Sequence, residues 1–128
     1  MLPEERDKEL IQNILEDYET LLQRKEHFNI TEESFLNDDS FEGSIAYDSL
    51  LIPVYTIVED VLHLSDELMS SFPDYPWEDV RGFRNIVAHG YRQISKEIAW
   101  KVIDEDIPEL IELLKSYLSE DFNNEIGQ

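Results

Sequence analysis

The chain has 128 residues, no cysteine, and 30 acidic against 10 basic residues, which give a formal net charge of −20. A chain of this length forms one domain with its own core, and the lack of cysteine excludes disulfides and thiolate metal sites. The charge argues against general binding to nucleic acid or anionic lipid. No apolar run approaches the ~18 residues that a membrane span needs, and the start of the sequence has no signal-peptide pattern. We therefore expect a cytoplasmic protein without a membrane segment.

The first predicted element is an amphipathic helix over residues 4–25, where apolar residues recur at steps of three and four. Residues 28–43 lose this period and collect Asn, Asp, Ser and Thr, so they are predicted to form a connector. Within it, Phe35 and Leu36 form a short apolar pair that we expect to dock on the core.

A second apolar stripe predicts a long helix over residues 41–70. Pro53 lies inside it and cannot donate to the helical hydrogen-bond ladder, so a kink or a helix start is expected there. The turn-rich break before Pro76 suits the start of a third helix over residues 76–89, and Gly90 is predicted to end it.

Ser95 is the predicted N-cap of a fourth helix, which Pro108 should bend or divide. Residues 121–128 are expected to fray. No segment alternates as a strand does, so the prediction is an all-α, up-and-down bundle of four to five helices that forms a single domain over residues 1–128.

The positive charge is concentrated in one segment. Five basic residues and one acidic residue between Arg81 and Lys101 give this stretch a net charge of +4, while the other 107 residues carry −24. Such clustering is either a solvated helix face or an anion-directed site. We assign Arg81 and Arg92 to phosphate binding, and we expect the acidic remainder to repel nucleic acid in general.

The same stretch gathers Arg84, Asn85, His89 and Tyr91 within eight residues. On an unbroken helix Arg84 and His89 would point about 140° apart, so they converge only if the helix ends between them. A left-handed Gly90 could swing His89 back toward Arg84. Histidine moves protons near neutral pH and arginine holds phosphate, a combination suited to RNA cleavage without a metal ion.

That reaction needs one group to accept a proton and another to donate one, and a single histidine does not readily do both. Two copies of His89 facing each other across one phosphate would supply both roles. We therefore predict a homodimer that pairs through the motif-bearing helices and forms a composite groove. The competing interpretation is a packed or surface histidine and a salt-bridged arginine, which are the commoner fates of these residues.

Arg84-Asn85, a three-residue spacer and His89-Gly90-Tyr91 resemble the motif of the HepT-like toxins, a family of HEPN-domain ribonucleases. The segments that extend this resemblance run from about residue 52 to residue 114, and they include Pro76-Trp77-Glu78 and Asp106-Ile107-Pro108-Glu109-Leu110. The resemblance implies a HEPN-like bundle, RNA as the substrate and no cofactor. It also implies a toxin of a type II/VII-like toxin–antitoxin system.

The resemblance also implies individual roles. Arg84 and His89 would be catalytic, Asn85 a polar helper, and Glu59 a residue that orients Arg84. A cognate minimal nucleotidyltransferase antitoxin would attach AMP to Tyr91, which would block the RNA phosphate site. The homodimer would then belong to a larger hetero-oligomer. The alternatives are a surface carboxylate at Glu59 and a tyrosine that packs its ring and leaves its hydroxyl in water.

Two other functions remain open on the sequence alone: a catalytically inactive RNA- or nucleotide-binding subunit of a nucleotidyltransferase complex, and a helical interaction module without a ligand. His27 and His63 lack neighbours at metal-ligand spacing, so no metal site is expected. Four glycines form no phosphate-binding loop, and no serine has nucleophile-elbow spacing. Trp77 and Trp100 are predicted to lie in the core or the dimer interface.

Overall fold

The computed structural model of the chain describes residues 2–90 and 93–126. In chain order the elements are α1 (Pro3–His27), α2 (Glu32–Asn37), α3 (Phe41–Val61), α4 (Asp66–Ser71), α5 (Trp77–Gly90), α6 (Lys96–Lys101), the π-helical turn η2 (Val102–Asp106) and α7 (Ile107–Ile126). No strand occurs among the described residues, and the predicted all-α class is confirmed.

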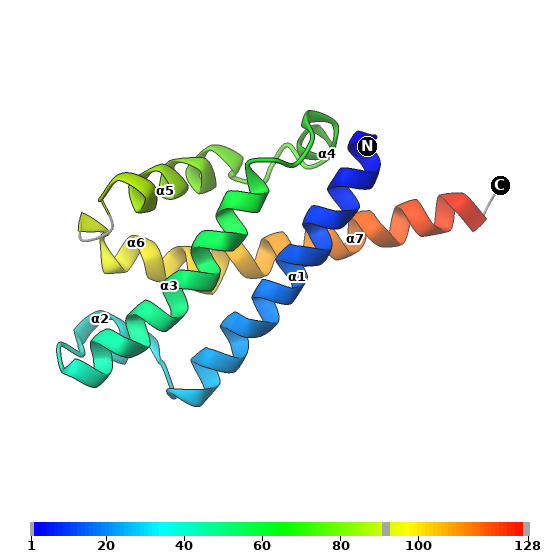
Figure 1. Ribbon diagram of the computed structural model, residues 1–128. Helices are drawn as coiled ribbons and strands as arrows, with labels where there is room; N and C mark the ends of the chain where they lie inside the picture. Colours follow the sequence, from blue (N-terminus) through cyan, green and yellow to red (C-terminus); the bar gives the residue numbers. More distant parts are fainter. Residues whose placement is uncertain (1, 91–92, 127–128) are drawn as a thin grey trace.

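The core lies where the two longest helices meet the last one. α1 and α3 run antiparallel and side by side, and the α6–η2–α7 segment crosses them (Figure 1). Each contributes fully buried aliphatic side chains at helical spacing, among them Ile11, Ile14, Leu50, Val54, Leu110 and Leu114. The apolar stripes of the sequence therefore face one another, as helix amphipathicity requires.

A contact with another helix compensates for the backbone hydrogen bond that Pro53 cannot make. α3 continues through Pro53, although proline has no N–H for the carbonyl four residues earlier. That carbonyl belongs to Ser49, and Arg24 of α1 donates to it from Nη1 at 2.9 Å. A side chain from α1 thus replaces the missing backbone donor.

The expected single helix over residues 41–70 is wrong, because α3 ends at Val61 and α4 starts at Asp66. Ser65 caps α4 by accepting from the N–H of Leu68. The buried carboxylate of Asp7 in α1 accepts from both the N–H of Ser65, at 2.9 Å, and its hydroxyl, at 2.6 Å. This contact spans 58 positions, so local sequence patterns could not reveal it.

The connector between the first two long helices contains a helix that the sequence did not predict. Thr31 and Ser34 form a capping box that starts α2, as such pairs do. The expected docking of Phe35 is confirmed, because this side chain is buried and its ring lies 5.2 Å from that of Trp100. Trp100 is itself a core residue.

The fourth predicted helix is divided, as expected from Pro108. Ser95 accepts from the N–H of Ile98 and caps α6. The π turn η2 precedes α7, and the N–H of Ile107 bonds to the carbonyl of Val102, five residues earlier. This shift occurs immediately before Pro108, where proline cannot continue an α-helical ladder. α7 extends to Ile126.

A search of the described residues for a helix both long and apolar enough to cross a membrane finds none.

Candidate functional site

Helix α5 carries the described part of the motif. Contacts of its buried face and of the turn before it fix its position. A buried stripe of Val80, Phe83 and Val87 packs it against the body of the protein, and α3 is the neighbouring helix (Figure 1). The turn before it is fixed by the buried Tyr75, whose hydroxyl donates to the carbonyl of Asp106 at 2.7 Å. Burial raises the pKa of Tyr75, so its hydroxyl stays protonated as a donor.

Arg84 of α5 is held by Glu59 of α3. Its Nε donates to Oε2 of Glu59 at 2.7 Å and its Nη2 donates to Oε1 at 3.3 Å. Its Nη1 donates to Oδ1 of Asn85 at 3.3 Å. The structure therefore brings together three residues that the sequence marked as site residues, and a two-point contact with a carboxylate fixes the plane of the guanidinium.

This pair keeps both partners charged. The hydrogen bond from Arg84 holds the pKa of Glu59 below its ordinary value, opposed by partial burial and aided by the charge of Arg84. The hydrogen bond to Glu59 raises the pKa of Arg84. The Arg84 side chain is 26% exposed and that of Glu59 is 32% exposed, so the pair lies at the surface. A solute anion can reach it.

Two residues that sequence reasoning left out of the site flank Glu59: Tyr55 on α3 and His63 in the turn that follows α3. Nε2 of His63 lies 3.9 Å from Oε1 of Glu59, and Tyr55 is one of the groups that influence the charge of Arg84. Tyr55 and Glu59 are four residues apart on α3 and therefore share one helix face, and His63 follows Glu59 by four residues, just beyond the end of the helix. The four-residue spacing on either side of Glu59 is the sequence signal that could have identified them.

The expected turn of the chain at Gly90 is wrong. α5 runs through Gly90, and no glycine in the described part of the chain has a positive φ. Arg84 and His89 thus lie on one continuous helix, about 140° apart around its axis. His89 is exposed in the last turn, so a single copy of the chain does not bring it to the face of Arg84.

The remaining predicted phosphate ligands are less well placed or not described. Arg81 is 45% exposed, and its Nη1 lies 3.2 Å from Oε1 of Glu78 on the same helix. Tyr91 and Arg92 lie outside the described residues. No group of three His, Asp or Glu side chains suited to a metal ion is found in the part of the chain that the structure describes.

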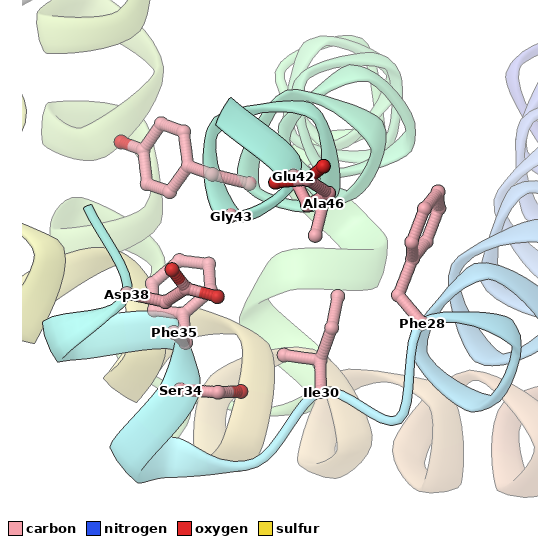
Figure 2. Close-up of a pocket in the computed structure, with 9 residues that line it drawn as sticks. Phe28, Ile30, Ser34, Phe35, Asp38, Glu42, Gly43 and Ala46 are labelled. Carbon is pink, nitrogen blue, oxygen red and sulfur yellow. The ribbon is translucent and has the colours of Figure 1, made fainter. Parts of the chain in front are cut away.

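A cavity of about 110 Å³ lies at the other end of α3, between α2 and the end of α1 (Figure 2). Figure 2 shows Ile30 pointing toward Ala46 of α3, beside Phe35. The charged side chains of its lining are the carboxylates of Asp38 and Glu42. A lining with this charge repels phosphate, so the α5 face is the better candidate for an RNA site.

Comparisons with known proteins identify the family. The sequence model of the family described as "Ribonuclease HepT-like" matches residues 11–117. "Putative RNase MJ0127" of Methanocaldococcus jannaschii is 24% identical over 96% of this chain and 99% of its own length. "Probable ribonuclease HepT" of Thermococcus cleftensis is 26% identical over 61% of this chain and 74% of its own.

A further relative is more similar over a shorter stretch. "Putative RNase MJ1380" of Methanocaldococcus jannaschii is 33% identical over 48 residues, which make up 38% of this chain and 44% of that protein. The match therefore spans less than half of that relative. The comparison with solved structures gave no significant match.

Proposed function

Because the chain belongs to the HepT-like ribonuclease family, we propose that it is an endoribonuclease in which Arg84 and His89 cleave RNA without a metal ion. The observation that carries the proposal is the guanidinium of Arg84, fixed at two points by Glu59 on the exposed motif face. Three of its five N–H groups have acceptors among the described residues, which leaves two for a phosphate oxygen.

In this reaction the ribose 2′-oxygen attacks its own phosphate. A base takes the 2′ proton, the bond to the 5′-oxygen breaks, and an acid protonates that leaving oxygen. The products are a 2′,3′-cyclic phosphate and a 5′-hydroxyl. Arg84 stabilises the extra negative charge of the five-coordinate phosphate, and histidine supplies the base and the acid.

A homodimer completes this site. One chain points Arg84 and His89 to different sides of α5, so a phosphate at Arg84 needs its proton-transfer group from elsewhere. A second copy that pairs through α5 could bring its own His89 to that phosphate, and two-fold symmetry would make the arrangement reciprocal. Light scattering of the purified protein should give twice the mass of one chain, and a monomer that retains full activity would contradict the pairing.

The test of the cleavage proposal is RNA hydrolysis in EDTA by wild type, Arg84→Ala and His89→Ala. Loss of a proton-transfer residue costs typically about 10²- to 10⁴-fold, and loss of a donor that stabilises charge in the transition state costs about 10²- to 10³-fold, so both variants should be slower by at least about a hundredfold. His27→Ala is the matched control, because His27 is exposed at the end of α1 and should leave the rate unchanged. Equal rates in all four proteins would contradict the assignment.

We further propose that the protein is the toxin of a toxin–antitoxin pair, neutralised by a minimal nucleotidyltransferase that attaches AMP to Tyr91. Tyr91 follows His89 by two residues, so bulky phosphate there would compete with RNA for Arg84. Incubation with such a transferase and ATP should raise the intact mass by AMP units. Retention of that increase in Tyr91→Phe would overturn the choice of residue.

A second candidate function is an inactive RNA-binding subunit of a nucleotidyltransferase complex. The separation of Arg84 and His89 on one helix favours it, because a single copy lacks a converged catalytic pair. This alternative predicts that wild type binds RNA, retains it uncut in the cleavage assay, and loses binding in Arg84→Ala.

A further inference from the structure

A groove between α3 and α5 adjoins the Arg84–Glu59 pair. It has a volume of about 350 Å³ and is lined by Leu51, Ile52, Tyr55, Thr56, Val87 and Ala88. Tyr55 precedes Glu59 by four residues and Ala88 follows Arg84 by four, so the groove starts one helical turn from the pair on both helices. A molecule bound at Arg84 therefore reaches the groove directly.

The lining combines apolar walls with a few polar groups. Leu51 and Val87 are buried and form the floor, whereas Ile52 is 60% exposed at the rim. Tyr55 is half-buried and contributes a ring and a hydroxyl, and Thr56 adds a second hydroxyl. Pockets with apolar walls and a few fixed polar groups are typical binding sites for small organic groups, and about 350 Å³ lies at the small end of their range.

The hydroxyl of Thr56 has a defined orientation. It donates to the carbonyl of Pro53 at 2.9 Å, so its lone pairs are left to accept from a ligand. A phenol ring beside a hydroxyl acceptor matches a flat heterocycle that stacks on one face and donates from its edge. This is the chemistry of a nucleobase.

Position along the helix points to the same ligand. Four residues of α-helix rise about 6 Å, which is comparable with the reach from a phosphate to a base within one nucleotide. None of the described residues that line the groove is charged, so this part of the groove suits the uncharged part of a nucleotide and not a second phosphate.

We propose that this groove is a nucleobase subsite, which takes the base next to the RNA phosphate held at Arg84 and contributes to the choice of cleavage position. The inference rests on the proposed function, because it presupposes RNA at Arg84. It assigns Tyr55 and Thr56 to the recognition of the base, roles that the motif of α5 does not contain.

The experiment tests protein variants that fill the groove against RNA substrates that lack one base. Ala88→Leu enlarges an exposed side chain in the groove, and Thr56→Met fills it independently from α3. Gly82→Leu is the matched control, because it places the same leucine side chain on α5 at a position where a Cβ meets nothing within 4 Å. The probe is a short RNA whose cleavage position has been mapped with wild type, compared with two versions that carry an abasic ribose on either side of that bond.

One abasic version should slow wild type roughly tenfold, as expected for loss of one stacked base. Ala88→Leu and Thr56→Met should cut the intact RNA roughly tenfold more slowly than wild type and lose nothing further on that abasic RNA. Gly82→Leu should behave as wild type. Additive losses from the filled groove and the missing base would overturn the subsite.

Two further outcomes separate this inference from its premises. If wild type cleaves RNA and the filled-groove variants cleave it equally well, the subsite is wrong and the proposed function stands. If wild type neither cuts nor binds the RNA, the proposed function fails and the subsite falls with it. If light scattering shows that Ala88→Leu and Thr56→Met halve the mass of a dimer, the groove is a contact between copies and the nucleobase assignment is overturned.

Discussion

At the scale of single residues, the main finding is that Arg84 is fixed from another helix. Its position on α5 places it at the surface, but Glu59 of α3 sets its orientation through two hydrogen bonds. The sequence predicted both residues through the family resemblance. It did not predict that Arg84 and His89 stay on different sides of one continuous helix, because α5 includes Gly90 and this glycine does not adopt the positive φ that would turn the chain back.

Removing the charge of Glu59 should slow cleavage without unfolding the protein. Glu59→Gln weakens the two-point contact and lets Arg84 swing, and displacement of a positioned group by about 1 Å can cost roughly a hundredfold in rate. The rate should fall by about ten- to a hundredfold in the RNA cleavage assay, with unchanged thermal stability. Glu105→Gln, at an exposed position of η2, is the control. An unchanged rate in Glu59→Gln would show that Arg84 needs no such orientation.

The pH dependence of the pair has a defined sign. Because the pKa of Glu59 is lowered in the folded protein, Glu59 stays ionised at every pH above the ordinary carboxylate pKa. The stabilisation that the Arg84–Glu59 ion pair contributes is therefore fully present in that range. It is lost only as the pH falls through the lowered value. The ratio of the wild-type rate to the Glu59→Gln rate should therefore stay constant between pH 8 and 5. A ratio that falls toward one within this range would contradict this prediction.

At the scale of helices, the sequence predicted the long elements well and their ends less well. Apolar periodicity located α1 and the last helix, and the turn-rich break before Pro76 located α5. The end of α3 at Val61 depends on Asp7 from α1, which holds Ser65 across the fold. The sequence did not predict α2, because its capping pair lies in a polar stretch that is equally typical of a loop. Contacts between distant segments decided these boundaries, and local patterns do not contain them.

The continuity of α3 through Pro53 should depend on Arg24. Arg24→Met leaves the Ser49 carbonyl without its donor at a partly buried position, and loss of a charged hydrogen bond costs about 1.5 to 3 kcal/mol. Denaturant unfolding should show this loss. Arg6→Met, at an exposed position of the same helix, should be close to neutral.

A second variant tests the cause. Pro53→Ala restores an N–H to α3 and gives Ser49 a backbone donor. The cost of Arg24→Met should therefore be smaller in the Pro53→Ala background than in wild type, as a double-mutant cycle measures. Equal costs in the two backgrounds would mean that Arg24 stabilises the protein through other contacts.

At the scale of the whole molecule, charge determines how RNA is approached. The residues outside the basic stretch 81–101 carry a net charge of −24, so the protein should hold few phosphates and repel the remainder of the RNA. The cavity at the far end of α3 shares this acidic character, with Asp38 and Glu42 in its lining. The distribution favours local recognition at α5 over a long nucleic-acid track.

Salt dependence measures this directly. For single strands the slope of log K against log salt is about −0.7 for each neutralised phosphate. A dimer that uses Arg81, Arg84 and Arg92 from both copies should therefore give a slope no steeper than about −4. Fluorescence anisotropy with cleavage-deficient His89→Ala and a labelled RNA provides the measurement. A slope beyond about −6 would require a more extensive basic surface than this chain offers.

The central claim is that RNA is cut by attack of its own 2′-hydroxyl at a site built from Arg84 and His89. Mass spectrometry of the products formed in EDTA tests it most directly. We predict fragments that end in a 2′,3′-cyclic phosphate and begin with a 5′-hydroxyl, formed by wild type and absent with Arg84→Ala or His89→Ala. Fragments with a 5′-phosphate and a 3′-hydroxyl, or the same products from the variants, would contradict it.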